Sequence, residues 1–292
     1  MRTIALLALM TGLALAAKPV FDVPEAGGFD RAMVTLGVTN DGDQPLKVEK
    51  GFCDGLTVAT KDGKELKMSQ CDDLGAFTLG AGETVSHRFN LVKCFPDLGT
   101  PGSYVVTWKH TVFGTAEPRK QEIEIVAEYA EIQYVDFGTV YCRFYGDKVP
   151  KTVENFKGLA LKGYYDNVPV HRIIPRFMMQ GGDKERGDGT GEPGFTIKDE
   201  PSPIAHAPGI LSMAKGGPDT GSTQFFICYV ATPWLDGKHT TFGKVMEGMD
   251  VVFQIERDVK LIPKPQTDPK FGKPLVAPVM KKVVWHEKKK TD

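Results

Sequence analysis

The side chains best suited to chemistry gather in short blocks in the second half of the chain. The first block, residues 170–183, places the cation Arg172 near the apolar Phe177 and Met178 and near the amide of Gln180. A guanidinium keeps its charge and offers several donors, so it can stabilise an electron pair without surrendering a proton. This block therefore offers a permanent cation beside apolar and amide side chains.

Two further blocks follow in a fixed order. One spans residues 209–215 and 222–227, and the other spans residues 234–239 and 241–245. Together with the first block they resemble the cyclophilin family of peptidyl-prolyl isomerases in order and spacing. Agreement of three long motifs is far more specific than any short pattern. The resemblance covers roughly residues 129–286 and implies a closed eight-stranded antiparallel β-barrel with two helices.

The resemblance also implies roles for individual residues. Arg172 corresponds to the catalytic arginine that faces the prolyl nitrogen, and the family needs no cofactor. The positions that correspond to substrate-binding residues are Phe177, Met178, Phe226 and Leu235 in the proline pocket, His239 at its edge, Gln180 on the substrate backbone, Gln224 and Trp234 on the binding face, and Ala214 and Lys215 beside the peptide. The backbone of this last pair should hold the peptide like an added strand.

Three positions depart from the family pattern. Lys215 stands where Asn is frequent, Val170 where Phe is frequent, and Arg176 where Gly is frequent. Because the contact at Lys215 is expected through its backbone, catalysis should survive, whereas substrate preference and cyclosporin binding stay open.

Other functions fit the same residues less well. A proline-peptide binding module in an extracytoplasmic assembly, with incidental catalysis, would use the same groove. A hydrolase is disfavoured because Ser212 and Ser222 lack a nucleophile-elbow motif. The glycine pattern of residues 189–194 is interrupted by Pro193 and precedes no helical pattern, so we interpret it as a turn at the groove edge. His171 should face the other side of a strand from Arg172 and be structural.

Length and composition define the setting. The chain has 292 residues, 36 basic and 37 acidic side chains and a formal charge of -1. At roughly 150 residues per domain this predicts about two domains, and the charge balance argues against nucleic-acid binding. The 32 glycines and 20 prolines favour a mainly β fold of short strands.

The first residues predict export. Met1 and Arg2 precede an apolar stretch that ends in small residues, which is typical of a signal peptide over residues 1–17. No later segment approaches the roughly 18 apolar residues of a membrane span. We therefore expect a periplasmic or secreted protein that acts on unfolded or extended proline-containing chains.

Residues 18–127 predict a β-sandwich that resembles an immunoglobulin-like domain. Alternating runs at 33–38 and 104–108 predict strands, and turn residues at 40–43, 61–64 and 80–83 suit about seven strands. This part carries no chemical motif, so we expect it to bind a protein partner or act as a spacer. An oxidising compartment would permit a bridge among Cys53, Cys71 and Cys94, with the pairing open.

Residues 128–292 form the predicted isomerase domain. A strand run is expected from Ile132 to Tyr145, then a helix after Pro150 that stops near Gly163. A second helical pattern starts at Met249, prolines at 263–278 predict a long loop, and a strand closes the domain at 280–285.

Overall fold

The computed structural model describes residues 17–288 except 72, 111, 113–116 and 269–270. These residues divide into two compact units between Ile125 and Val126. The predicted signal peptide lies outside the described residues except for Ala17. Among the described residues, no helix is long and apolar enough to cross a membrane. Strands dominate both units, which confirms the mainly β fold class.

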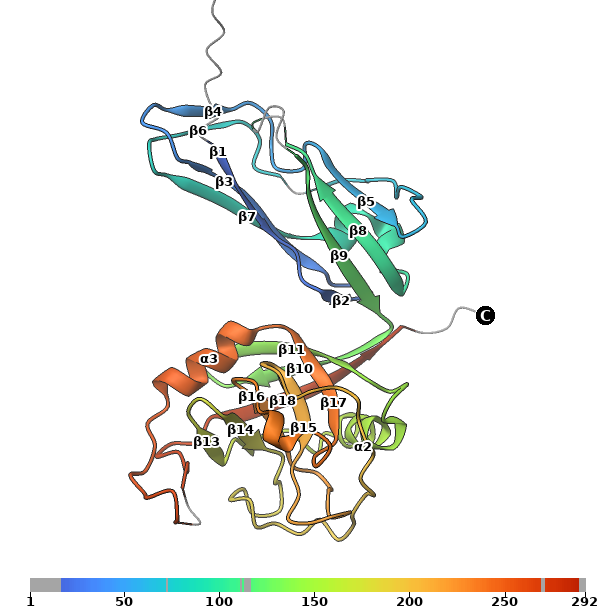
Figure 1. Cartoon of the computed structure of the whole chain (residues 1–292), viewed down its shortest axis with the longest axis vertical. Helices are drawn as coiled ribbons and strands as arrows, with labels where there is room; N and C mark the ends of the chain where they lie inside the picture. Colours follow the sequence, from blue (N-terminus) through green and yellow to red (C-terminus); the bar gives the residue numbers. More distant parts are fainter. Residues whose placement is uncertain (1–16, 72, 111, 113–116, 269–270, 289–292) are drawn as a thin grey trace, which may run out of the picture. The chain divides into compact units, whose positions relative to one another are not determined.

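Among its described residues the first unit has nine strands and one short α-helix. It is the blue to green part of Figure 1. The strands are β1 (Ala17–Asp22), β2 (Ala26–Gly28), β3 (Met33–Asn40), β4 (Leu46–Val48), β5 (Leu56–Thr60), β6 (Phe77–Leu79), β7 (Thr84–Asn90), β8 (Gly102–Trp108) and β9 (Arg119–Val126). Helix α1 (Leu91–Cys94) precedes a 3-10 turn at Pro96–Gly99. The nine strands exceed the about seven that the turn spacing predicted, and β2, β4 and β6 have only three residues each.

Two sheets of this unit enclose one core. The sheets have the orders β1-β3-β7 and β2-β9-β8-β5, and β4 pairs with β6 separately. Alternate residues of β3, β8 and β9 point inward, among them Leu36, Trp108 and Ile123, which are at most 1% exposed. This period-2 burial is what a strand with one packed face produces. The immunoglobulin-like assignment of the unit stays a prediction.

One disulfide fastens this unit. It joins Cys71 to Cys94, which ends α1, and it closes a loop of 23 residues in sequence separation. Ser69, close to the bridge, donates its backbone N–H to the carbonyl of Cys94 at 2.8 Å. The structure thus selects one of the pairings that the sequence left open.

The second unit is built on one antiparallel sheet. Its order is β12-β18-β10-β11-β17-β15-β16-β14-β13. The strands are β10 (Glu128–Tyr134), β11 (Gly138–Phe144), β12 (Val168–Pro169), β13 (Arg172–Ile174), β14 (Met178–Gly181), β15 (Ile210–Met213), β16 (Phe225–Cys228), β17 (Thr241–Glu247) and β18 (Val279–Glu287). The predicted single run from Ile132 to Tyr145 was wrong, because a turn with Asp136 at φ 63° folds it into the β10–β11 hairpin.

The two ends of this sheet are the same stretch of chain. β12 pairs with β18 and β13 pairs with β14, yet only Val170 and His171 separate β12 from β13. Counted as one interrupted strand, this stretch closes a ring of eight. The closed eight-stranded antiparallel barrel predicted from the resemblance is therefore the observed architecture, with a break that bends the chain from one neighbour to the other.

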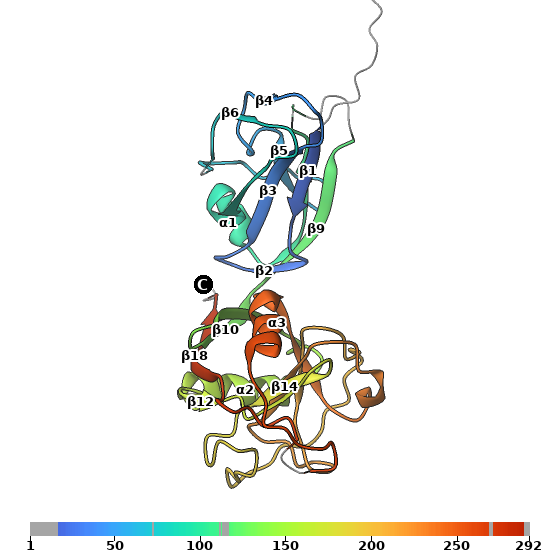
Figure 2. The same cartoon turned by 90° about the vertical axis from the view of Figure 1, so that its left-hand side faces the viewer.

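Two helices pack against the barrel (Figure 2). Helix α2 (Pro150–Leu161) begins with proline, which suits a first helical position, and buries Val153, Phe156 and Ala160 on one face. Helix α3 (Met249–Asp258) buries Val251, Val252 and Ile255. Both faces join the barrel core, and α2 packs on β18 whereas α3 packs on β11.

Candidate active site

A row of four side chains crosses the outer face of the barrel. Arg172 lies opposite Gln180, Gln180 opposite Phe226, and Phe226 opposite Ser212 in successive antiparallel pairs. Directly opposed residues share a face of the sheet. The neighbouring row, which includes Ile173, Met179 and Ile227, points into the barrel core. The period of two thus turns one set of side chains outward and the other inward.

A small apolar cluster lies on this outer face, separate from the barrel core. Met178, Phe226 and Cys228 are its buried members, at 2%, 4% and 0% exposure, and partly buried Ile174, Phe177, Ala214 and Leu235 pack around them. An apolar patch built outside the main core has no role in closing the barrel. It is instead suited to receive an apolar group from outside.

This cluster forms part of the wall of a cavity of about 610 Å³. Every predicted site residue except Trp234 lines it, namely Arg172, Phe177, Met178, Gln180, Ala214, Lys215, Gln224, Phe226, Leu235 and His239. The structure therefore brings together residues that are up to 67 positions apart in sequence, from Arg172 to His239. Their individual roles in binding and catalysis stay predictions.

Arg172 is half-buried at the edge of this cavity and is held through its backbone and one side-chain bond. Its Nε donates to the carbonyl of Phe271 at 3.4 Å. The next residue, Ile173, donates its N–H to the carbonyl of Gly272 at 2.7 Å. Within the described part of the chain no carboxylate pairs with Arg172, so its terminal N–H groups are available to the cavity. Burial lowers the pKa of Arg172, but a guanidinium remains charged.

Amide groups form the polar side of the cavity. Gln180 donates from Nε2 to Oε1 of Gln224 at 3.0 Å, and Gln224 donates from Nε2 to the carbonyl of Gly189 at 3.1 Å. These bonds fix both amides next to Arg172. They also tie the sheet to the loop that forms the cavity edge, where the sequence predicted a turn.

Asp183 organises that loop from within. Its carboxylate accepts backbone N–H bonds from Arg186, Asp188, Gly189 and Gly191. Burial raises the pKa of Asp183, but the four hydrogen bonds lower it by more. The net pKa of this carboxyl therefore lies below its usual range. The ionised carboxylate therefore acts as the anchor of the cavity edge.

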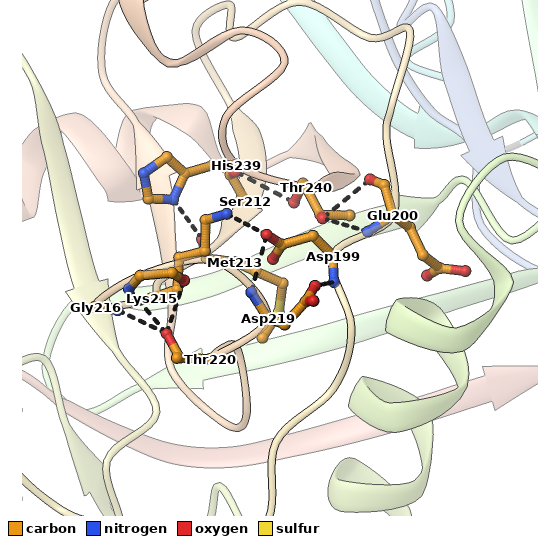
Figure 3. Close-up of polar contacts among 11 residues, drawn as sticks. Asp199, Glu200, Ser212, Met213, Lys215, Gly216, Asp219, Thr220, His239 and Thr240 are labelled. Carbon is orange, nitrogen blue, oxygen red and sulfur yellow. Dashed lines mark hydrogen bonds and ion pairs between the residues drawn. The ribbon is translucent and has the colours of Figure 1, made fainter.

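The side chain of Lys215 points at Asp199 and bonds its carboxylate (Figure 3). Asp199 in turn accepts the N–H of Asp219 at 3.2 Å and donates its own N–H to Asp219 at 2.8 Å. The ammonium of Lys215 is thus paired, and its side chain is only 12% exposed. This geometry fits the expected backbone contact and explains how a lysine is accommodated there.

The rim of the cavity is formed by the chain before β17. A 3-10 turn, Pro233–Leu235, presents Leu235 to the cavity, and Trp234 lies beside Phe177 with 5.9 Å between ring centroids. Trp234 is 56% exposed and does not line the cavity itself. His239 meets Phe226 edge-on at 5.7 Å and donates from Nδ1 to the carbonyl of Met213 at 2.9 Å.

Several residues of the cavity wall were not among the predicted site residues. Thr190, Glu192, Gly216, Thr220 and Ser222 also line the cavity. Thr190 and Glu192 fall in the turn predicted at the groove edge, which was a signal for them. The carbonyl of Phe271 carried no signal, because its loop reaches Arg172 only in the folded barrel.

The structure also shows the surroundings of Arg176 and Val170, the two other departures from the family pattern. Arg176 has a φ of 58°, in the left-handed region where glycine is the least strained residue. Val170 is 2% exposed in the barrel core. His171, predicted to be structural, lies in the break between two strands and is 7% exposed, and its ring nitrogens have no hydrogen-bond partner among the described residues.

A group of side chains close enough together to hold a metal ion lies in the first unit. Within the described ranges, the grouping found is Cys53, Cys71 and Cys94 in the first unit, whose sulfurs lie within 4.8 Å of one another. Two of these three cysteines are joined in the disulfide.

The barrel thus carries a cation, paired amides and an apolar cluster on its outer face. The family model for cyclophilin type peptidyl-prolyl cis-trans isomerase/CLD matches residues 129–273. A crystal structure of such an isomerase from Cryptosporidium parvum is 32% identical, covers 55% of this chain and 98% of its own, and has a TM-score of 0.48. A second structure from that organism, in the presence of the dipeptide Ala-Pro, is 31% identical, covers 55% of this chain and 99% of its own, with a TM-score of 0.48.

The chain belongs to the cyclophilin-type peptidyl-prolyl cis-trans isomerase family. The family match lies within the second unit, and this unit is the isomerase.

Proposed function

We propose that this protein is an exported prolyl isomerase that acts on unfolded or extended clients, with Arg172 as its electrostatic catalyst. Amide resonance imposes a barrier of roughly 18–20 kcal/mol on the X-Pro bond. In the twisted transition state the nitrogen lone pair is no longer delocalised. A donor aimed at that nitrogen stabilises the twisted form selectively, because the planar amide offers no such lone pair.

The observation that carries the proposal is the position of Arg172 beside the apolar cluster. Its guanidinium has no carboxylate partner within the described residues and shares a face with Gln180 and Phe226. A prolyl ring in the slot between Phe226 and Met178 would bring its nitrogen toward this cation, while Gln180 is suited to bond the client backbone. Exclusion of water by the apolar wall strengthens the interaction between the guanidinium and the nitrogen.

The decisive experiment is an exchange assay with a short Ala-Pro peptide, followed by NMR. One preorganised donor is worth about 2.7–4 kcal/mol in oxyanion holes, so we expect Arg172→Ala to lower kcat by about two to three orders of magnitude. Arg172→Lys should recover only part of the rate, since the ammonium is shorter and lacks the guanidinium geometry. Arg257→Ala is the matched control, because Arg257 is 69% exposed on α3 and pairs with Asp258.

The two alternative functions, a proline-peptide binding module and a hydrolase, predict different results in this assay. A proline-peptide binding module would bind the peptide with negligible turnover in the unmodified protein. A hydrolase would release a cleaved product and show a strong pH dependence. Turnover that survives Arg172→Ala unchanged would contradict the catalytic role of the guanidinium.

The export role is supported by two features. The amino-terminal pattern of a signal peptide precedes the first strand, and the Cys71–Cys94 disulfide suits an oxidising compartment. Uncatalysed prolyl isomerisation takes tens to hundreds of seconds, so a folding enzyme has a use there. Expression of the full chain in a bacterium, followed by cell fractionation and amino-terminal sequencing, should yield a periplasmic or secreted form that begins at Ala17 or Lys18. Full-length protein retained in the cytoplasm would contradict export.

A further inference from the structure

A buried histidine stands directly behind the predicted proline slot. The side chain of His206 has 0% exposure, and its ring stacks on Phe226 with 6.0 Å between centroids and 10° between planes. Phe226 therefore has a polar ring behind it and the edge of His239 beside it. The orientation of the slot wall depends on what holds His206.

Four hydrogen bonds hold His206 between two parts of the fold. Its Nδ1 lies 2.7 Å from Oδ1 of Asp236, and its backbone N–H donates to the same oxygen at 2.8 Å. Its Nε2 lies 2.9 Å from Oγ of Ser212 on β15, and its carbonyl accepts the N–H of Thr232 at 2.9 Å. Thr232 and Asp236 flank the 3-10 turn Pro233–Leu235, so His206 links the barrel wall to both sides of that turn. We name residues 232–239 the rim segment.

The rim segment carries side chains that define the slot. Leu235 and His239 line the cavity, and Trp234 lies against Phe177. Within the segment, Leu235 donates its N–H to the carbonyl of Thr232 and accepts the N–H of His239, so a displacement at Asp236 moves its neighbours as well. The position of the Asp236 carboxylate therefore affects the position of the whole rim segment.

The proton positions follow from the partners. A carboxylate only accepts, so Nδ1 of His206 carries a proton and donates it to Asp236. Nε2 of the neutral ring then accepts the hydroxyl of Ser212. A second proton on Nε2 would turn that hydroxyl toward the carbonyl of Thr240, which lies 3.2 Å away. Burial lowers the pKa of His206, against the raising effect of Asp236, which keeps the ring in its neutral Nδ1–H form near neutrality. His239 is the other titratable group that faces it.

We propose that His206 is a positioning residue for the isomerase, which fixes Phe226 by stacking and the rim segment through Asp236, so that the slot keeps its shape for the prolyl ring. The inference rests on the proposed use of this cavity for the prolyl residue. His206 has no exposed surface and acts only through other residues. Because a well-shaped slot holds the ring equally in the ground state and the transition state, its loss should raise KM more than it lowers kcat.

The test is a kinetic comparison of His206→Ala, His206→Asn and His206→Gln on the Ala-Pro peptide. We expect His206→Ala to raise KM by about 10-fold with kcat changed less than about 3-fold, the opposite of the kcat loss for Arg172→Ala. The amide of His206→Asn can replace Nδ1 and reach Asp236, whereas that of His206→Gln replaces Nε2 and reaches Ser212. His206→Asn should therefore recover more of the wild-type KM, since its bond holds the rim segment.

His286 provides a matched control in the same barrel. It stacks on Tyr129 at 4.5 Å and lies 3.3 Å from Oε2 of Glu131, so it has the same kinds of contact away from the cavity. His286→Ala should lower the melting temperature without a change in KM. If His206→Ala does not fold, Asp236→Ala tests the same link, because that carboxylate is 38% exposed and its loss removes only the rim tie.

The outcomes separate the inference from the proposed function. Absence of turnover in the wild type would overturn the proposed function itself. An active wild type whose folded His206→Ala and Asp236→Ala variants keep the wild-type KM would overturn only the positioning role. Equal KM changes in His206→Ala and His286→Ala would also overturn it, because they would reflect general destabilisation.

Discussion

Arg172 and Gln180 face each other directly across the antiparallel pair of β13 and β14, and no ion pair is needed to hold them there. The backbone ladder fixes their spacing, while Gln224 fixes the amide of Gln180 and the carbonyl of Phe271 fixes Nε of Arg172. The cation and the amide thus form a preorganised polar edge beside an apolar slot. Preorganisation matters because donors that are already in place need no reorganisation during the reaction.

Removal of the amide should weaken client binding while the cation stays in place. We expect Gln180→Ala to lower kcat/KM by about 10-fold, since a hydrogen bond to the client backbone is lost and Gln224 loses its donor. The peptide exchange assay measures the effect. Gln133→Ala on β10 is the control, because Gln133 bonds Glu131 away from the cavity. A wild-type kcat/KM in Gln180→Ala would exclude Gln180 from binding.

The rate and the stability should respond differently to pH. Arg172 does not titrate near neutrality, so kcat should be nearly flat from about pH 6 to 9. Burial lowers the pKa values of His171 and His206 below 6.5. The unfolded chain then binds more protons than the folded chain as pH falls below 6.5, so the stability present above that pH is progressively lost. Denaturant unfolding at several pH values should show this loss of unfolding free energy, and the loss should be smaller in His206→Gln. The same dependence of unfolding free energy on pH in His206→Gln and the wild type would contradict a lowered pKa of His206.

The loop that Asp183 anchors should loosen when the carboxylate is removed. Asp183→Ala leaves four backbone N–H groups without their acceptor, which we expect to cost on the order of 3 kcal/mol of unfolding free energy. Asp183→Asn should cost less, because the amide retains one oxygen acceptor. Denaturant unfolding measures the cost, and Asp147→Asn is an exposed control. Equal stabilities of Asp183→Ala and the wild type would contradict the anchoring role.

Trp234 should report peptide binding through its fluorescence. It is 56% exposed at the rim, whereas Trp108 and Trp285 are at most 9% exposed. A bound prolyl peptide that covers the rim should shift its emission to shorter wavelength, and Trp234→Phe should abolish the shift. A shift that persists in Trp234→Phe would place the peptide elsewhere.

The disulfide should stabilise the first unit without affecting catalysis. For a loop of 23 residues, loss of the bridge in a Cys71→Ala, Cys94→Ala double variant should cost about 3 kcal/mol. Circular dichroism during denaturation should detect an earlier transition, while the peptide exchange rate should stay at the wild-type value. A loss of exchange rate would show that the isomerase depends on the first unit.

Some of the fold could be predicted because it depends on local physics. Pro150 and the buried spacing of Val153, Phe156 and Ala160 indicated helix α2, and alternation at 104–108 indicated β8. The hairpin at Asp136 was missed, because a non-glycine residue at positive φ gives no turn signal comparable to an Asn-Gly pair. The resemblance of three motifs supplied the barrel, which local patterns could not have closed.

The sequence by itself determined the chemistry: a permanent cation, amides and apolar side chains in a family pattern that names the reaction. Only the tertiary structure decided which groups hold that chemistry in place, from the carbonyl of Phe271 behind Arg172 to the stacked ring of His206 behind Phe226. The reason is physical. Residue types fix what a group can donate, accept or bury, whereas a hydrogen bond between residues 99 positions apart exists only after the barrel has closed.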